Sequence, residues 1–376
     1  MEKSSEGSSE RVAVAADDAA DAAKQAKRAK RPSGWQLTRR TWTLMISVLV
    51  VAALGLLGGL VKVPYVALGP GPTYDTLGAV GGKTVVQISD QQPFPTTGHL
   101  TMTTVSLTDE VTLFGALGLW ASGRYALAPR EEYYKPGQSE QQVQQDNVKA
   151  FQDSQTNAEV AALRYLGYQL KVTADQIVKG SPADNTIEPG DRLVSVNGKT
   201  FGNSDEMREV LKATKPGDKV AVTFQHDKQE PRTAEITLGK SDDRTWGFLG
   251  VSPIDQADVK FKVTITLPDV GGPSAGLMFA LAIIDKLTPD NINGGQSVAG
   301  TGEIDPAGNV KPIGGIPFKM MAARDGGATV FLVPTANCEE AKQKAPDGLR
   351  LIKVDKLADA VSSLKAMKDN KDTPHC

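Results

Sequence analysis

Two residues in the C-terminal half of this 376-residue chain, Ser274 and Lys319, have surroundings that suit nucleophilic chemistry. Ser274 lies between small residues in Asp269-Val-Gly-Gly-Pro-Ser-Ala-Gly-Leu-Met278, just before an apolar run. A serine at the start of a buried helix lies beside unpaired amides and the positive end of the helix dipole, where a developing oxyanion is stabilised. A serine that only caps the helix would need no partner elsewhere, so a nucleophile also requires a base.

Lys319 is the candidate base, because it follows the apolar, glycine-rich turn Pro312-Ile-Gly-Gly-Ile-Pro-Phe318. Burial there would disfavour the charged form of the lysine and lower its pKa. A neutral lysine can accept the serine proton and later give it to the leaving amine. The alternatives are a solvated Lys319 on a helix surface and the competing Lys311, which falls in an expected exposed strand or turn.

The segments that must position this pair alternate between helix and strand, as in an α/β domain. The run 277–284 is apolar on all sides and predicts a central buried helix, with Pro273 in its first turn. A second helix begins near Pro317 and ends at Gly326-Gly327. Further strands are expected at 84–89, 99–107, 330–334 and 351–354, and further helices at 110–121, 139–166, 338–344 and 356–367.

Residues 165–240 form a block of separate character. Gly180-Ser-Pro-Ala183 precedes Pro189-Gly-Asp-Arg-Leu-Val-Ser-Val-Asn-Gly198, a turn, strand and hairpin signal, and a capped helix is expected at 204–213. The block resembles a PDZ domain of the bacterial protease-associated type. The resemblance implies that amides near Leu166, Gly167 and Tyr168 hold a peptide C-terminus while the peptide adds as a strand.

Three motifs, in order, resemble those of the Lon-type serine proteases, which use a Ser-Lys dyad. They are Gly272-Pro-Ser-Ala-Gly276, Thr301-Gly-Glu-Ile304 and the run from Pro312 to Lys319. The resemblance implies that Ser274 is the nucleophile, that Lys319 is the base and that Thr301 orients the lysine, with Gly272 and Asp269 in support. Many family members carry an acid three residues before the serine. This chain has Gly271 there, and Asp269 is the nearest acid.

The run 44–61, LMISVLVVAALGLLGGLV, carries no charge and is long enough to cross a ~30 Å hydrocarbon core. Its flanking charges predict a cytoplasmic N-terminus, because only Lys62 is basic immediately after it. The preceding basic residues are Lys24, Lys27, Arg28, Lys30, Arg31, Arg39 and Arg40. A cleaved signal peptide is the alternative, but no Ala-x-Ala site follows the run.

Composition and motif counts argue against other functional classes. A net charge of −2 gives no reason to expect a nucleic-acid partner. Three scattered histidines and two cysteines do not match a metal-site spacing, so neither a metal nor another cofactor is expected. The segment 78–84 resembles a P-loop but is one residue too short between its glycines. Whether Cys338 and Cys376 pair is left open.

The order of segments resembles that of membrane-anchored, PDZ-containing Lon-like serine proteases of bacteria, without an AAA+ ATPase module. We expect an α/β (α+β) Lon-type proteolytic domain with an inserted PDZ domain, after one transmembrane helix. The expected segments are a disordered cytoplasmic tail (1–40), a membrane anchor (41–63), a linker with the first part of the Lon-like domain (64–160), a PDZ domain (161–241), a proteolytic core (242–368) and a flexible tail (369–376).

The sequence thus predicts an ATP-independent endopeptidase that cuts peptides or flexible protein segments outside the cytoplasm. The resemblance adds a homo-oligomer as a further expectation. The alternative function is a non-catalytic PDZ scaffold with a protease-like fold. A signal-peptidase-like enzyme is disfavoured, because its serine lies next to the membrane segment and Ser274 lies far beyond it.

Overall fold

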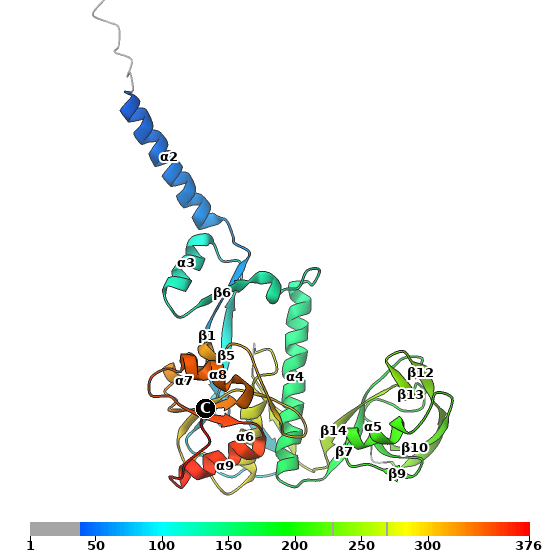
Figure 1. Cartoon of the computed structure of the whole chain (residues 1–376). Helices are drawn as coiled ribbons and strands as arrows, with labels where there is room; N and C mark the ends of the chain where they lie inside the picture. Colours follow the sequence, from blue (N-terminus) through cyan, green and yellow to red (C-terminus); the bar gives the residue numbers. More distant parts are fainter. Residues whose placement is uncertain (1–37, 228, 268–269) are drawn as a thin grey trace, which may run out of the picture. The chain divides into compact units, whose positions relative to one another are not determined.

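The computed structural model describes residues 38–227, 229–267 and 270–376 (Figure 1). It divides into two units, Met1–Val61 and Lys62–Cys376. The described part of the first unit is the helix α2, Arg39–Leu60, which Thr38 caps. Within the described ranges α2 is the one helix long and apolar enough to cross a membrane. Most of the predicted tail, residues 1–37, lies outside the described residues.

The second unit contains a mixed sheet in the order β20-β19-β16-β5-β1-β6. Strands β5, β16, β19 and β20 run parallel, and β1 runs antiparallel to both of its neighbours. This mixed arrangement agrees with the α/β class that the alternating segments predicted. The strands are β1 Tyr65–Asp75, β5 His99–Thr108, β6 Ala126–Pro129, β16 Ser297–Gly300, β19 Val330–Pro334 and β20 Arg350–Val354.

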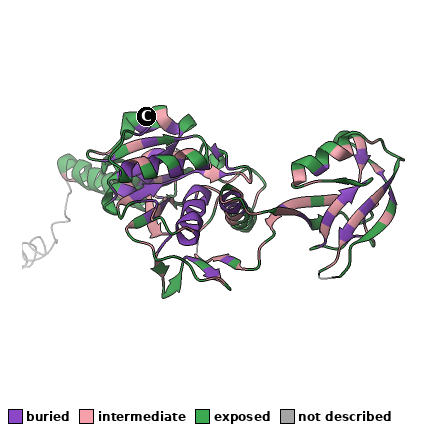
Figure 2. Cartoon of the chain, turned by 90° about the horizontal axis from the view of Figure 1, so that it is seen from below, coloured by how far each residue is buried: buried purple, intermediate pink, exposed green. Residues whose placement is uncertain are grey.

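The helix α6, Gly276–Leu287, is buried at every residue (Figure 2). The apolar run 277–284 predicted this burial, whereas the buried Asp285 and Lys286 that follow it are charged. The long helix α4, Glu140–Tyr165, packs against it, with Phe151 meeting Phe279 edge to face. The helix α7, Ile316–Asp325, packs against β1 and β5 and has Pro317 in its first turn. The other helices of this part are α3 Leu113–Ala121, α8 Cys338–Lys344 and α9 Leu357–Lys368.

The expected linker after the membrane segment is wrong, because residues 65–75 form β1, a strand of the main sheet. The strand contains Pro70 and Pro72. It tolerates them because its pairing with β5 shifts register between Pro70 and Thr73, at a bulge. The glycines make room for neighbours. A Cβ on Gly69 would lie 2.4 Å or less from two ring atoms of Tyr125, and one on Gly71 would lie 2.4 Å from Thr104 Oγ1.

Residues 170–257 form a second sheet with its own core, in the order β11-β10-β8-β7-β14. The helix α5, Ser204–Lys212, is capped by Asn203 and buries Met207. The last strand, β14, lies beyond residue 241, where the sequence predicted the end of this domain. The strands are β7 Leu170–Ile177, β8 Arg192–Val196, β9 Lys199–Thr200, β10 Lys219–Gln225, β11 Arg232–Thr237 and β14 Val251–Ala257.

The chain end is attached to the main sheet. Cys338 and Cys376 form a disulfide, and His375 makes an isolated β-bridge with Ile352 of β20. The segment 369–376, predicted to be a flexible tail, is therefore held at its end. The remaining short strands are β2 Ala79–Val80, β3 Lys83–Thr84, β4 Val86–Ser89, β12 Gly239–Ser241, β13 Arg244–Phe248, β15 Lys262–Ile265, β17 Glu303–Ile304 and β18 Val310–Lys311.

Candidate active site

Ser274 lies in the tight turn that enters the buried helix α6. Gly272 has a φ of 85°, a backbone conformation that a residue with a side chain rarely adopts, and this explains why glycine stands two residues before the serine. The helix begins at Gly276, so Pro273 lies before it and not in its first turn, where the sequence placed it. The turn therefore places Ser274 at the N-terminal end of α6.

Two residues of α4 hold this turn in place. The backbone N–H of Gly272 donates to the carbonyl of Asn147 at 2.9 Å. The hydroxyl of Ser154, which is almost fully buried, donates to the carbonyl of Pro273, also at 2.9 Å. Sequence reasoning missed both α4 residues, because a polar residue in an amphipathic helix gives no local sign of a partner more than a hundred positions away.

Lys319 reaches the serine from the first turns of α7. Its Nζ lies 2.8 Å from Ser274 Oγ and 3.0 Å from Thr301 Oγ1. The turn before the helix is tight: Gly315 has a φ of 72°, and a Cβ there would lie 2.6 Å from a methyl carbon of Val105. Lys319 is only 3% exposed, and this burial lowers its pKa to about 7.

Thr301 connects Ser274 and Lys319. Its fully buried hydroxyl donates to the carbonyl of Ser274 at 3.0 Å, and the N–H of Gly302 donates to the same carbonyl at 2.9 Å. A hydroxyl has one proton, so once Thr301 has donated it, the oxygen is available only as an acceptor for Lys319 Nζ. Thr301 thus fixes both the backbone at Ser274 and the direction of the lysine.

The pair opens onto a cleft of about 880 Å³. Its walls come from β1, β5, the Ser274 turn and the turn before α7, and they are largely apolar. The hydrophobic wall includes Leu68, Tyr74, Met102, Val105, Tyr133 and Phe318. Its size falls in the range of sites that accept organic ligands or short peptide segments.

The entry to α6 lies at the wall of the cleft. The first amides of an α-helix have no intrahelical acceptor and lie at the positive end of the dipole. Ser274 and Ala275, at the entry to α6, both line the cleft. A carbonyl oxygen attacked by Ser274 would develop its negative charge close to these amides.

Of the four remaining predicted site residues, Asp269 lies outside the described residues, and the loop Leu166-Gly-Tyr168 does not line the cleft. Leu166, Gly167 and Tyr168 follow the end of α4, where Leu166 and Tyr168 pack against the main core. They do not line the small hollow beside α5, whose walls include Met207 and Leu211 of the helix and the segment from Trp246 to Val251. In the sequence, this wall segment contains Gly247-Phe-Leu-Gly250, two glycines that flank apolar residues just before β14. That pattern was the available signal for a turn at this place.

The segment 78–84 and Lys311, which the sequence analysis also singled out, can be located in the structure. The segment 78–84, which resembles a P-loop, contains the β2–β3 hairpin, with Gly81 and Gly82 at positive φ in its turn. Among the described residues, His, Cys, Asp and Glu form no group of three or more that could hold a metal ion. Lys311, the competing lysine, pairs with Glu303 at 3.3 Å and has a side chain that is 51% exposed.

Comparison with known proteins matches two parts of the chain. Residues 248–366 match the Lon protease (S16) C-terminal proteolytic domain, and residues 143–238 match a PDZ domain. Lon protease 2 of Bacillus subtilis is 38% identical over 109 residues, which are 28% of this chain and 18% of that protein. Lon protease of Phenylobacterium zucineum is 30% identical over 160 residues, which are 41% of this chain and 20% of that protein.

The chain therefore spans a fifth or less of the length of these two relatives. The PDZ domain of an SdrC-like protein from Listeria monocytogenes is 24% identical and covers 22% of this chain and 85% of that one, with a TM-score of 0.20. That score is too low to support an argument. From the family matches and the mixed α/β fold, we conclude that the chain carries a PDZ domain and a Lon-type C-terminal proteolytic domain.

Proposed function

We propose that this protein is a serine endopeptidase with a Ser274–Lys319 dyad. The observation that carries the proposal is the 2.8 Å contact between Lys319 Nζ and Ser274 Oγ at the wall of an open cleft. Burial lowers the pKa of the lysine to about 7, so a large fraction of it is neutral at neutral pH and can accept a proton.

In the proposed first step, Ser274 Oγ attacks the scissile carbonyl while its proton moves to Lys319 Nζ. The amides of Ser274 and Ala275 stabilise the oxyanion of the tetrahedral intermediate. When the C–N bond breaks, Lys319 gives the proton to the departing amine. The products are a free amine and an acyl ester on Ser274.

In the second step, water attacks the ester carbonyl while Lys319 accepts a proton from it. The tetrahedral intermediate collapses, the C–O bond to Ser274 breaks, and Lys319 returns the proton to Ser274 Oγ. Throughout, Thr301 is a positioning residue. It holds Lys319 Nζ by accepting a hydrogen bond and takes no part itself in bond making, bond breaking or proton transfer.

We propose that the substrates are peptides or flexible segments of proteins and that cleavage needs no ATP. The dyad chemistry consumes no nucleotide, and an extended chain fits an open cleft more readily than a folded domain. The test uses the purified full-length protein in detergent and a quenched-fluorescence peptide library without nucleotide. Hydrolysis by the wild type, its loss in Ser274→Ala and Lys319→Met, and no stimulation by ATP are the expected results. An inactive wild type that still binds peptides would favour the non-catalytic scaffold.

We propose that the PDZ domain selects substrates through the groove between α5 and β14. The edge strand β14 pairs with β7 on one side only, and the hollow next to it is lined by Met207, Arg208 and Leu211 of α5. A peptide can add to such an edge as a further strand, with its C-terminal carboxylate held by backbone amides. The segment Gly247-Phe-Leu-Gly250 replaces residues 166–168 as our candidate for the carboxylate-binding loop.

We propose that α2 anchors the protein in the cell membrane, with the N-terminus in the cytoplasm and residues 62–376 outside. The length and apolar surface of α2 support the anchor. The Cys338–Cys376 disulfide supports the external location, because disulfides persist in oxidising compartments. Assembly into a homo-oligomer stays a prediction from the family resemblance.

The location can be tested with the two cysteines. Intact cells are treated with a membrane-impermeant alkylating reagent, before and after reduction, and the protein is analysed by mass spectrometry. We expect alkylation of Cys338 and Cys376 only after reduction by an agent that does not enter cells. Unpaired cysteines, alkylated only after cell lysis, would indicate a cytoplasmic location.

A further inference from the structure

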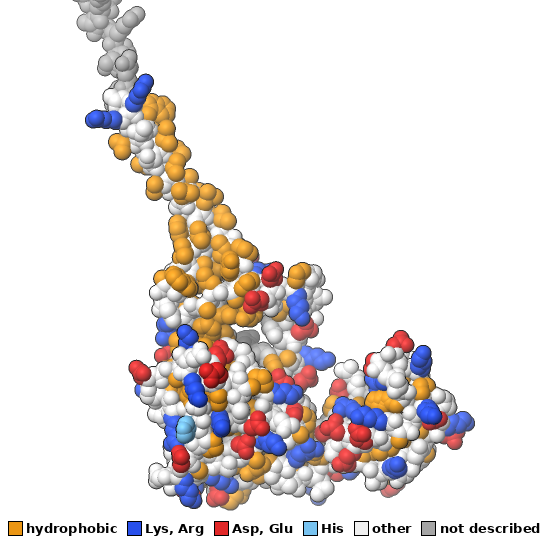
Figure 3. All heavy atoms as spheres, in the orientation of Figure 1, with side chains coloured by type: hydrophobic (Ala, Val, Ile, Leu, Met, Phe, Trp, Pro, Cys, Tyr) orange, Lys and Arg blue, Asp and Glu red, His pale blue; other side chains and the backbone are white. Residues whose placement is uncertain are grey.

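The helix α3 has an unusual distribution of side chains. Its sequence, LFGALGLWA, has no charged residue. The small Ala116 is buried, whereas Leu113, Phe114, Leu117 and Trp120 are 45%, 52%, 48% and 62% exposed. Hydrophobic side chains gather over α3 in Figure 3. We call these four residues the α3 apolar face. Exposure of such a face to water is unfavourable, and it usually marks a surface that contacts a membrane or another protein.

Backbone pairing holds α3 next to the segment that follows the proposed membrane anchor. Thr112, the N-cap of α3, forms a β-bridge with Lys62, and the N–H of Val63 donates to the carbonyl of Val111 at 2.9 Å. Lys62 follows Leu60, the last residue of α2, by two positions, which is at most about 7 Å of extended chain. Bridged residues lie about 5 Å apart. Thr112 is therefore within about 12 Å of the end of the anchor.

That upper limit allows α3 to begin within the interfacial layer of a bilayer. The headgroup region adds roughly 5–8 Å on each side of the hydrocarbon core. Trp is enriched in this layer, because its ring is apolar and its N–H finds a polar partner. A short apolar helix whose start is tied to the exit of the anchor can lie in this layer with its face toward the acyl chains.

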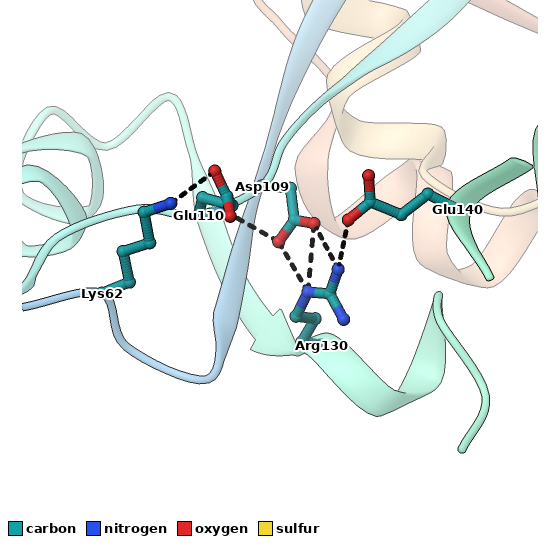
Figure 4. Close-up of polar contacts among 5 residues, drawn as sticks. All are labelled: Lys62, Asp109, Glu110, Arg130 and Glu140. Carbon is teal, nitrogen blue, oxygen red and sulfur yellow. Dashed lines mark hydrogen bonds and ion pairs between the residues drawn. The ribbon is translucent and has the colours of Figure 1, made fainter. Parts of the chain in front are cut away.

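The acidic residues beside α3 are paired with cations (Figure 4). Lys62 Nζ lies 2.6 Å from Glu110 Oε2, and Arg130 binds Asp109 through two nitrogens, with Nη2 at 2.8 Å. Arg130 Nη2 also contacts Glu140, the first residue of α4, at 2.9 Å. The pairing lowers the pKa of Asp109, chiefly through the Arg130 hydrogen bonds. The network keeps these carboxylates from acting as isolated charges at a lipid surface and links the segment before α3 to the start of α4 through Arg130.

We infer that the α3 apolar face inserts into the bilayer interface beside the anchor and that the cleft receives its substrates from the membrane surface. The inference rests on the proposed membrane anchor. A hollow beside α3 is lined by Leu117, Trp120, Tyr125, Ala126 and Leu127, and Ala126 also lines the cleft of Ser274. An apolar wall thus leads from α3 to the dyad. The favoured substrates are segments that emerge from a membrane, such as the residues following a membrane span.

The alternative partner for the same face is a second copy of the chain. The network of Figure 4 and the bridge to Lys62 favour lipid, because they tie the face to the point where the chain leaves the bilayer. A contact between two copies of the chain would not require α3 to be held near the end of the anchor. The two occupants also differ in a measurable way, since only lipid brings acyl chains within contact of Trp120.

The test uses the full-length protein with one tryptophan retained and the other three replaced by Phe, reconstituted in phosphatidylcholine vesicles. Trp120 reports on α3, Trp42 on the anchor and Trp246, in β13, on the PDZ domain. Lipids brominated near the headgroup quench tryptophan on contact, and iodide quenches from water. An unchanged far-ultraviolet circular dichroism spectrum shows that each variant is folded.

We expect bromolipid to quench Trp120 about as much as Trp42, and to leave Trp246 unquenched. If Trp42 is quenched by bromolipid while Trp120 is quenched only by iodide, the inference fails and the anchor stands. If Trp120 is shielded from both quenchers, another copy of the chain covers the face and the inference also fails. If neither Trp42 nor Trp120 responds to bromolipid, the proposed anchor fails as well.

Discussion

The hydroxyl of Thr301 donates its single proton to the backbone carbonyl of Ser274, 3.0 Å away. This contact decides what the threonine can offer to Lys319, because the oxygen is then available only as an acceptor. Lys319 Nζ therefore has two oxygen acceptors, Ser274 Oγ and Thr301 Oγ1, at 2.8 and 3.0 Å. A lysine side chain is flexible, and the contact with Thr301 helps to direct Lys319 Nζ toward Ser274 Oγ.

Thr301→Val should lower kcat by about 10²-fold with little change in KM, because a misplaced base reduces the rate without removing substrate contacts. The variant keeps the shape of the side chain and loses the hydroxyl. Thr301→Ser is the matched control, since it keeps the hydroxyl and should recover most of the rate. Steady-state kinetics on one peptide measures both. Equal losses in the two variants would mean that Thr301 acts through packing alone.

The rate should depend on pH through the lysine. The pKa of Lys319 is lowered to about 7, and the neutral form is the active one, so kcat/KM should rise as pH increases through about 7 and level off above it. Lys311→Met is the control, because Lys311 is half exposed and paired with Glu303. It should leave the profile unchanged. A wild-type rate that rises only near pH 10 would show that Lys319 has an ordinary pKa and would contradict the assignment.

The buried lysine should reduce stability near neutral pH. Between pH about 7 and 10.5, Lys319 is neutral when folded and protonated when unfolded, so the free energy of unfolding rises with pH by about 1.4 kcal/mol per unit. Below pH 7 the contribution of Lys319 to the free energy of unfolding no longer changes with pH, and its destabilising effect is largest there. Lys319→Met removes the cost.

The variant should therefore unfold at a higher temperature than the wild type at pH 7, and the difference should shrink toward pH 10. Thermal unfolding of both proteins in the same detergent measures the difference. Lys311→Met again serves as the control, since an exposed lysine contributes no such cost. A difference that is independent of pH would contradict the depressed pKa.

Peptide binding by the PDZ domain should depend on α5 and not on the end of α4. Leu211→Lys places a charge in the hollow between α5 and the segment 246–251 and should weaken the binding of peptides with free C-termini about tenfold or more. Leu166→Ala, at the loop that the sequence suggested, should change binding little. Fluorescence anisotropy with a pool of random peptides tests both, and amidated peptides control for the carboxylate. A larger loss of binding in Leu166→Ala than in Leu211→Lys would instead support residues 166–168 as the carboxylate-binding loop.

The sequence was most informative where function requires a rare local combination of residues. Small residues before Ser274 and the glycine turn before Lys319 are needed for backbone conformations that other residues avoid, and these patterns are visible without a structure. The lowered pKa of Lys319 was anticipated only as a consequence of burial. The distances among Ser274, Thr301 and Lys319 depend on how three separate segments pack.

Other features depend on contacts that no local pattern records. Gly69 and Gly71 made the segment after the membrane run resemble a linker. In the structure both belong to β1, and they lack side chains because Tyr125 and Thr104 pack closely against them. The sequence also did not indicate the edge strand β14, beside which we propose the peptide groove, because β14 comes after the rest of the domain in sequence. The contributions of Asn147 and Ser154 to the Ser274 turn are likewise set by tertiary packing.

The most direct test of the central proposal is covalent labelling by a fluorophosphonate, which reacts with activated serines. The full-length wild type, Ser274→Ala and Lys319→Met are treated at pH 8, and the modified peptide is identified by mass spectrometry. We predict one adduct, on Ser274, in the wild type and none in either variant. An adduct on a different serine, or equal labelling of Ser274 in Lys319→Met, would show that the Ser274–Lys319 dyad is not the catalytic centre.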